Sequence, residues 1–154
     1  MQSTEITFDN LSETGGLFTA LLHARYHHFI MVRGWPLPNV RGLEFDQYDT
    51  PDTVHCAIHD GAIVQGGFRM TPTTAQCMNS TYMLRDAQRG LLPDLPRDVL
   101  DAEAPQDPRI WEVSRVFVSD SLSSRDRMQV RTTLGRSFAH LSQKWQIDGF
   151  LCLT

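Results

Sequence analysis

The chain has 154 residues, of which 41% are hydrophobic and 21% charged, and this balance excludes a wholly disordered protein. We expect a single domain over residues 1–154, because this length supports one hydrophobic core and is short for two. The net charge of −4 argues against a nucleic-acid-binding protein, since neutralising phosphates requires a basic excess.

Of the 14 lysine and arginine residues, all but one are arginines, and the single lysine is Lys144. The guanidinium group suits bidentate recognition of carboxylate or phosphate. A GC-rich genome, which favours arginine codons, would produce the same bias. The excess is compatible with an anion-recognising site but does not by itself establish one.

Other features are absent from the sequence. The N-terminus has no basic region followed by an apolar run, and no stretch approaches the apolar length of a membrane span, so we expect a cytoplasmic protein. Cys56, Cys77 and Cys152 are odd in number and have no CxxC spacing. This predicts free, buried thiols and neither a disulfide framework nor a zinc site.

The first predicted element is a helix over residues 17–32, in which apolar residues recur at helical spacing. Asn10 and Glu13 precede it three residues apart, as in a capping box. Gly34 and the prolines Pro36 and Pro38 end the helical pattern and begin an irregular segment.

A β-hairpin is predicted next. Apolar and polar residues alternate over residues 54–59, the turn pair Asp60-Gly61 follows, and residues 62–70 form a second β-rich run. Gly66-Gly67 inside this run indicates a bulge or a close backbone approach just before Arg69.

The second half of the chain continues the mixed pattern. Residues 71–108 are loop-rich, with one short helix expected near residues 83–92, and residues 109–118 form an expected central strand carrying Glu112 and Arg115. Ser123 or Ser124 caps a long helix, which Gly149 ends before the short strand FLCLT. The apolar line of this helix consists of Val130, Leu134, Phe138, Leu141 and Trp145. The order of elements predicts an α/β (α+β) fold with a mixed sheet and helices on its faces.

Arg25 does not fit the pattern of a solvated helix. It lies three residues after Leu22 and four before Phe29, within the apolar stripe, so its side chain should face inward. A buried guanidinium without partners is costly, so acceptors must come from elsewhere in the fold. One interpretation is a buried ion pair that only locks the first helix.

The candidate acceptors lie further along the chain. Glu44 and Asp46 would share one face of an extended segment, with Asp49 close behind. Glu112 is a fourth acid, and Arg69 and Arg115 are two further arginines on predicted strands. Strict alternation would place Glu112 and Arg115 on opposite faces, so a shared site requires a bulge or a strand end between them.

So many charges on core elements favour a polar small-molecule pocket over a purely structural network. Arginines suit a bound carboxylate, and aspartates suit a bound amine or ribose hydroxyl. Phe29 and Trp35 could pack against a flat ring or a sulfonium cation.

Other candidate motifs are weaker. His23, His27 and His28 could suggest a metal, but solvated histidines are the favoured interpretation, and the same holds for His55 and His59. No serine lies in a GxSxG elbow, and no phosphate-cradling glycine loop is present. Neither a metal centre nor covalent nucleophilic catalysis is indicated.

The charged residues form part of a longer pattern that resembles the LuxI-type acyl-homoserine lactone synthases, also called autoinducer synthases. The resemblance runs from about residue 18 to 118. The pattern consists of Arg25, Phe29, Arg33 and Trp35, then Glu44, Asp46 and Asp49, then Gly67-Phe68-Arg69 with Thr71-Pro72-Thr73, and finally Trp111-Glu112-Val113-Ser114-Arg115.

The resemblance implies a fold like that of the GCN5-related N-acetyltransferases (GNAT). In this three-layer fold two central strands of a mixed sheet splay apart to admit an acyl–pantetheine arm, and here those strands would be residues 64–71 and 110–118. The family continues with another helix and strand, so this chain, which reaches Thr154, would be C-terminally short.

The resemblance also implies a reaction. An acyl chain passes from acyl carrier protein, or from coenzyme A (CoA), to the amine of S-adenosylmethionine. Ring closure then gives an N-acyl-homoserine lactone, a quorum-sensing signal, and releases methylthioadenosine. The thioester and S-adenosylmethionine are substrates, and no metal or bound cofactor is implied.

Roles carry over by position. Glu112 would be the general base, with Asp46 or Glu44 as the other candidates, and Met83, Ser114 and Phe117 would contact the acyl chain. Arg85 and Arg89, or Arg127, Arg131 and Arg136, would meet an acidic carrier protein. The S-adenosylmethionine side would comprise Arg25, Phe29, Trp35, Asp46, Asp49, Arg69 and Arg115, the last of which would order the carboxylates.

Two alternatives stay open at the level of sequence. The first is an acetyl-CoA-dependent N-acetyltransferase of the same fold, although residues 131–136 match the usual pyrophosphate loop poorly. The second is a catalytically inactive homologue that only binds S-adenosylmethionine.

Overall fold

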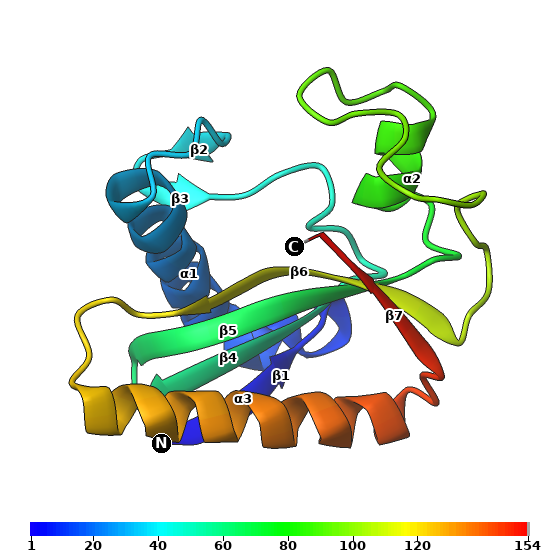
Figure 1. Ribbon diagram of the computed structural model, residues 1–154. Helices are drawn as coiled ribbons and strands as arrows, with labels where there is room; N and C mark the ends of the chain where they lie inside the picture. The colour runs from blue at the N-terminus through cyan, green and yellow to red at the C-terminus, as the bar shows by residue number, and fades with distance from the viewer. Residues whose placement is uncertain (154) are drawn as a thin grey trace.

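The structure is a computed structural model that describes residues 1–153, and in this part of the chain a five-stranded sheet lies between helices (Figure 1). The strands of the main sheet are β1 (Gln2–Ile6), β4 (Val54–Asp60), β5 (Ile63–Pro72), β6 (Ile110–Val118) and β7 (Gly149–Cys152). The helices are α1 (Leu11–Arg25), α2 (Met83–Gln88) and α3 (Ser124–Lys144). Shorter elements are the 3₁₀ turn η1 (Phe8–Asn10), the π-helix η2 (Tyr26–Val32) and the two-residue strands β2 (Asn39–Val40) and β3 (Leu43–Glu44).

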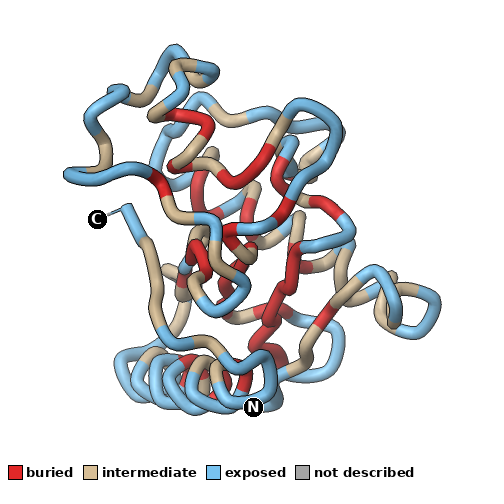
Figure 2. The backbone as a smooth tube through the Cα atoms, turned by 90° about the vertical axis from the view of Figure 1, so that its right-hand side faces the viewer, coloured by how far each residue is buried: buried red, intermediate tan, exposed pale blue. Residues whose placement is uncertain are grey.

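The sheet has the order β1-β4-β5-β6-β7, and all neighbours are antiparallel except β6 and β7. Helix α3 runs along one face, and α1 lies on the other (Figure 1). Buried residues concentrate along the strands between these layers, as Figure 2 shows. The expected mixed α/β sheet with helices on both faces is confirmed.

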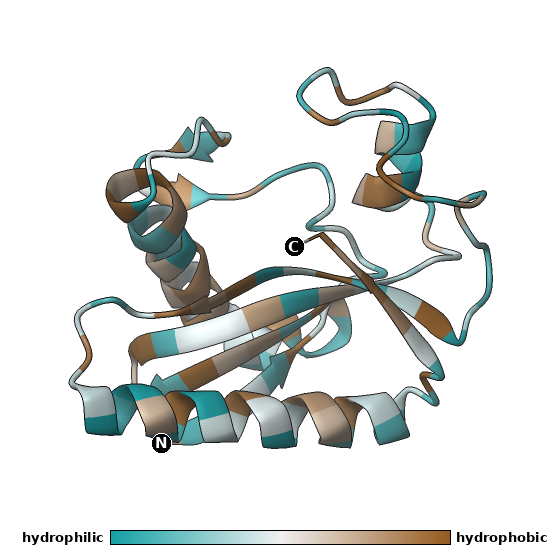
Figure 3. Cartoon of the chain, in the orientation of Figure 1, coloured by the Kyte–Doolittle hydropathy of each residue, from teal (hydrophilic) through white to brown (hydrophobic). Residues whose placement is uncertain are grey.

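Helix α3 covers its face of the sheet with the predicted apolar line. Val130, Leu134 and Leu141 are buried against core residues of the sheet, and Figure 3 shows hydrophobic and hydrophilic bands alternating along the helix. The side chain of Ser123 caps the helix by accepting the Asp126 N–H at 3.2 Å. Gly149 does not end the helix as expected. The left-handed residue after its last turn is Gln146, with φ 53°, and Gly149 begins β7.

Helix α1 differs from its prediction at both ends. The expected pairing of Asn10 with Glu13 does not form, because the Asn10 side chain accepts the Thr7 N–H at 2.9 Å and stabilises η1 instead. After Arg25 the chain widens into the π-helix, in which the Arg33 N–H bonds to the His28 carbonyl five residues earlier. Residues 17–32 are therefore helical, but only their first part is α-helical.

The β4–β5 hairpin confirms its prediction, including the role of its paired glycines. A Cβ on Gly67 would lie 2.6 Å from the Cys56 carbonyl oxygen, and one on Gly66 would lie 2.8 Å from the Phe117 carbonyl oxygen. Only glycine permits so close an approach of the backbones on both sides of β5.

A bulge interrupts β6 at the point where a shared site required one. Arg69 pairs with Ser114 and Gly67 pairs with Phe117, so two residues of β6 lie opposite the single residue Phe68. Arg115, the first of the two, has φ 53°. The bulge returns its side chain to the face that carries Ser114.

The two strands expected to splay apart, residues 64–71 and β6, are hydrogen-bonded to each other on both sides of this bulge. Pairing stops instead on the other edge of β6. Strand β7 pairs with residues 110–113 only, and residues 114–118 have no partner on that side within the described chain. The opening in the sheet is therefore next to β7.

Some elements and environments were not predicted. Strand β1 was missed because its sequence QSTEI is polar and only Ile6 joins the core. Cys56 is buried as expected, but Cys77 and Cys152 are exposed. None of the helices in residues 1–153 is long and apolar enough to cross a membrane.

Candidate functional site

Arg25 lies at the end of α1 with its side chain only 1% exposed. Its Nε donates to Glu44 at 2.5 Å, and its two terminal nitrogens donate to the two carboxylate oxygens of Asp49 at 2.8 and 3.0 Å. The prediction that a buried Arg25 needs distant acceptors is confirmed. Its bidentate pairing is the strong form of this interaction.

Arg69 projects from β5 onto the same face and is also 1% exposed. Its terminal nitrogens donate to both oxygens of Asp46, at 2.5 and 3.1 Å, and one of them also donates to Asp49 at 3.0 Å. Its Nε donates to the Ser114 hydroxyl on β6 at 2.9 Å. Arg69 thereby joins both central strands to the acidic segment.

Arg115 completes the arrangement from the bulge of β6. It donates to Glu44 at 3.1 Å and to Asp46 at 2.8 Å. Three guanidinium groups thus meet three carboxylates, and the formal charges cancel. We call Arg25, Glu44, Asp46, Asp49, Arg69 and Arg115 the charge network.

The arginines keep two carboxylates of the charge network, those of Asp49 and Asp46, ionised. Burial alone would raise the pKa of Asp49, but the charges of Arg25 and Arg69 outweigh it and hold that pKa well below its usual value. The pKa of Asp46 is lowered in the same way, with Arg69 opposing the effect of burial. Both groups are therefore anions at neutral pH.

Glu112 lies outside the network and has the opposite character. It is 2% exposed, one of its oxygens accepts the Leu84 N–H at 3.3 Å, and the other has no hydrogen-bond partner among residues 1–153. Burial raises the pKa of Glu112 to about 7, although that N–H and the charge of Arg69 oppose the shift. A carboxyl group with this pKa can accept or donate a proton near neutral pH.

A cavity of about 510 Å³ opens beside the network, and we call it the site cavity. Its polar wall includes Asp46, Ser114 and Arg115. Trp35, half exposed at 47%, stacks on the buried Phe29 with ring centroids 5.1 Å apart, and the Arg115 guanidinium lies 5.7 Å from the Phe29 ring. The apolar wall consists of Trp35, Pro36, Leu37, Pro38, Met83, Leu92, Pro93, Leu95, Val113 and Leu153.

The structure brings most of the predicted site residues together. Met83 and Ser114 line the site cavity, as expected for the acyl side. Phe117 does not. It lies in the core beside α1, on the same face of the sheet as Arg69 and Ser114, and packs edge-to-face against Phe29 with ring centroids 5.9 Å apart. It borders a separate hollow of about 600 Å³ with residues 119–122, so its place on the acyl side stays a prediction.

Sequence reasoning missed Tyr48 and Asp86. Asp86 is 1% exposed on α2, where it accepts the Thr81 hydroxyl and N–H at 2.6 and 3.0 Å and the Tyr48 hydroxyl at 3.2 Å. The Tyr48 ring lines the site cavity and lies 5.9 Å from the Arg69 guanidinium. The available signal was an aspartate between Leu84 and other apolar residues of a short helix.

The histidines are less solvated than predicted. His55 and His59 are buried in β4, and His28 is buried in η2, where its Nδ1 lies 2.8 Å from Asp120 Oδ2. Burial lowers the pKa of His55 to about 3 despite the nearby Asp49. Within residues 1–153 no group of three or more His, Cys, Asp or Glu residues could hold a metal ion.

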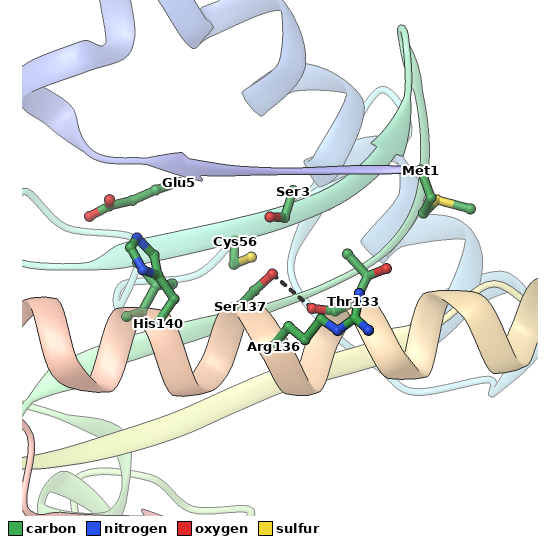
Figure 4. Close-up of a pocket in the computed structure, with 9 residues that line it drawn as sticks. Met1, Ser3, Glu5, Cys56, Thr133, Arg136, Ser137 and His140 are labelled. Atoms are coloured by element: carbon green, nitrogen blue, oxygen red, sulfur yellow. Dashed lines mark hydrogen bonds between the residues drawn. The ribbon is translucent and has the colours of Figure 1, made fainter.

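A further hollow lies on the opposite face of the sheet. It has a volume of about 450 Å³ and lies between β1 and α3, with Cys56 at its base and Arg136 and His140 on the helix side (Figure 4). Arg136 was one of the arginines expected to meet a carrier protein, but α3 places it on the side of the sheet away from the charge network.

Solved structures share this fold. They include the acyl-homoserine lactone synthase LasI, with a TM-score of 0.69 and 23% identity over 98% of this chain and 70% of that chain. An acyl-CoA N-acyltransferase from Pseudomonas aeruginosa aligns with a TM-score of 0.52 and 15% identity over 94% of this chain and 72% of its own. These two structures define the class of fold, which is shared by an acyl-homoserine lactone synthase and an acyl-CoA N-acyltransferase.

Sequence relatives narrow the class to a family. The chain is 41% identical over 111 residues to an acyl-homoserine-lactone synthase of Ralstonia nicotianae, a match that covers 70% of this chain and 48% of the relative. It is 30% identical over 141 residues to one of Vibrio anguillarum, covering 89% of this chain and 66% of the relative. BjaI, a CoA-dependent acyl-homoserine lactone synthase solved with S-adenosylmethionine and isopentyl-CoA, aligns at 27% identity with a TM-score of 0.65 over 91% of this chain and 60% of BjaI.

No protein-family model matches the chain. The agreement of sequence relatives and solved structures nevertheless shows that the chain belongs to the LuxI-type acyl-homoserine lactone synthase family. It spans about half to two thirds of the length of these relatives.

Proposed function

We propose that this protein is an acyl-homoserine lactone synthase. It transfers an acyl chain from acyl carrier protein or CoA to the amine of S-adenosylmethionine and then closes the lactone ring. The observation that carries the proposal is the charge network beside a cavity with an apolar wall. Glu112, whose pKa burial raises to about 7, lies on β6 two residues before Ser114 of the cavity wall. Both substrates are intracellular metabolites, so we place the reaction in the cytoplasm.

S-adenosylmethionine would bind against the charge network. Its carboxylate would meet the arginines and its amine the aspartates, while its sulfonium and adenine would lie against Trp35 and Phe29. The network is electrically balanced, which suits an amino-acid headgroup that carries both charges. The acyl chain would occupy the apolar wall near Met83.

Among the three candidate bases, the contacts favour Glu112. Both oxygens of Glu44, and both of Asp46, accept hydrogen bonds from arginines, so neither carboxylate has an oxygen left free to take a proton from the substrate. Glu112 keeps one oxygen free of such bonds, and its pKa lies near 7. It would take a proton from the α-amine, directly or through a water molecule.

The reaction would proceed in two steps. The neutral amine attacks the thioester carbonyl, an amide bond forms, and the thiolate leaves and takes up a proton. Backbone N–H groups in residues 114–118 of β6, which have no partner on the β7 side, could stabilise the oxyanion. The methionyl carboxylate then attacks its own γ-carbon and expels methylthioadenosine, favoured by a bent substrate geometry.

The test is to incubate the purified protein with S-adenosylmethionine and a panel of acyl-carrier-protein and acyl-CoA thioesters, and to follow lactone and methylthioadenosine by mass spectrometry. We expect both products in equal amounts. Binding of S-adenosylmethionine without products would favour the non-catalytic homologue. Acetyl transfer to another amine without S-adenosylmethionine would favour the acetyltransferase and reject the synthase.

A further inference from the structure

A second polar hollow lies on the outer side of α2, away from the charge network. Its volume is about 540 Å³, and its lining comes from α2 and from the loops on either side of that helix. The polar side chains around it are those of Arg85 and Arg89, the carboxamides of Gln76, Asn79 and Gln106, and the hydroxyl of Thr81.

The charge around this hollow is only partly neutralised by the protein. None of its lining residues is acidic, and among the described residues Arg85 has no ion-pair partner. Arg89 reaches only Asp86, at 3.4 Å, and that carboxylate already accepts shorter hydrogen bonds from Thr81. Arg85 and Arg89 are four residues apart on one helix face, where like charges repel each other. An anion between them would remove this repulsion.

The geometry points to a phosphoryl-binding site at this hollow: we propose that Arg85 and Arg89 hold a phosphate group there. Each guanidinium presents a planar fork of N–H donors, and the surrounding carboxamides can add neutral donors. A phosphate has more acceptor oxygens than a carboxylate and so matches this number of donors better.

The proposed phosphate site and the site cavity are lined by different residues of the same short segment around α2. Met83 faces the site cavity, whereas Arg85 and Arg89 on the same helix face the hollow. The phosphate could be inorganic phosphate, or it could belong to the acyl donor, since CoA carries phosphoryl groups. The site itself stands without the proposed function, and only the second source rests on it.

The experiment is calorimetric titration of the 154-residue chain with inorganic phosphate at constant ionic strength. We expect saturable binding that weakens at least about tenfold in the double variant R85Q/R89Q, because both charge-assisted contacts are lost. The matched control R41Q/R125Q removes the same charge from exposed positions outside the hollow and should bind as the native chain does. R85K/R89K keeps the positive charges but loses the planar guanidinium donors, so its affinity for phosphate should lie between those of the native chain and R85Q/R89Q.

Absence of saturable binding by the native chain, or equal weakening in R41Q/R125Q, would overturn the proposal. Circular dichroism of each variant checks that the fold persists. A parallel titration with CoA separates the two sources. If R85Q/R89Q binds both CoA and phosphate more weakly than the native chain does, the phosphate group belongs to the acyl donor. If only phosphate binding is weakened, the site binds the free anion.

Discussion

Arg25 and Glu112 are both buried and ionisable, but they differ in how fully the fold satisfies them. All three donor nitrogens of Arg25 are bonded to carboxylates, whereas one oxygen of Glu112 has no partner in the described chain. The first arrangement fixes a charge in place. The second leaves a group whose charge depends on pH, which is the property that a proton-transfer residue requires.

Replacing Arg25 by alanine should lower the free energy of unfolding by about 3–5 kcal/mol, because Glu44 and Asp49 would remain buried without their shared partner. Urea unfolding followed by tryptophan fluorescence measures this. The control is Arg33→Ala, an exposed arginine 3.5 Å from Asp120, which should change stability by no more than about 0.5 kcal/mol. Equal stability of the two variants would contradict a supporting role for the network.

For Glu112, the proposed base role predicts a pH profile. Only the carboxylate form accepts a proton, so lactone formation should rise as pH increases through about 7. Glu112→Gln should reduce turnover at least about a hundredfold while S-adenosylmethionine still binds. The exposed Glu103→Gln is the matched control. A Glu112→Gln protein with native turnover would exclude this residue as the base.

At the scale of elements, the site depends on two departures from regular strands. The paired glycines let β5 approach both neighbours closely, and the β6 bulge turns Arg115 toward Glu44. The bulge could be inferred as a requirement because Glu112 and Arg115 are three residues apart. Its position at Arg115 could not, since non-glycine residues rarely adopt positive φ and nothing local marks this one.

The glycine requirement can be tested at Gly67. In Gly67→Ala the new methyl would lie 2.6 Å from a backbone oxygen of β4, so we expect a loss of about 2 kcal/mol or more in unfolding free energy. Gly135→Ala on α3 meets no atom within 4 Å and should stabilise the protein by up to about 1 kcal/mol. Thermal unfolding of both variants measures these changes. A Gly67→Ala protein more stable than the native chain would contradict the close approach of β4 to β5 at Gly67.

Other elements show where sequence patterns reach their limit. The period of apolar residues indicated a helix through Val32 but could not distinguish a π-helical end from an α-helical one, because tertiary packing decides it. The burial of Asp86 and its hydrogen bonds from Tyr48 and Thr81 could not be predicted, since an aspartate on a short helix is ordinarily solvated. Arg25, by contrast, could be predicted to be buried, because its position within the apolar stripe is visible in the sequence.

For the molecule as a whole, two sets of groups shape stability in opposite directions. Asp46 and Asp49 have lowered pKa values when folded, so their contribution is present above the unfolded value near 4 and is lost as pH falls further. Glu112 has a raised pKa, so stability is highest below about 4.5 for this group and decreases as pH rises toward 7. Burial lowers the pKa of His55 to about 3, so its contribution is present above the unfolded value near 6.5 and is lost as pH falls below it. Between about pH 5 and 6.5 the effects of His55 and Glu112 on stability therefore oppose each other.

Urea unfolding between pH 3 and pH 8 tests this profile. Relative to the native chain, Glu112→Gln should gain up to about 3 kcal/mol in unfolding free energy at pH 8 compared with pH 5, while the acid limb stays as in the native chain. The same pH dependence in both proteins would mean that Glu112 does not titrate in this range.

The charge network also carries a consequence for how the protein folds. Its contacts join residues that are 24, 69 and 71 positions apart, the last between Glu44 and Arg115. Closing such long loops costs chain entropy before the contacts form, so the network should complete late in folding. During synthesis it cannot close until Arg115 has left the ribosome. A small molecule that binds the network would therefore recognise only chains whose sheet is already assembled through β6.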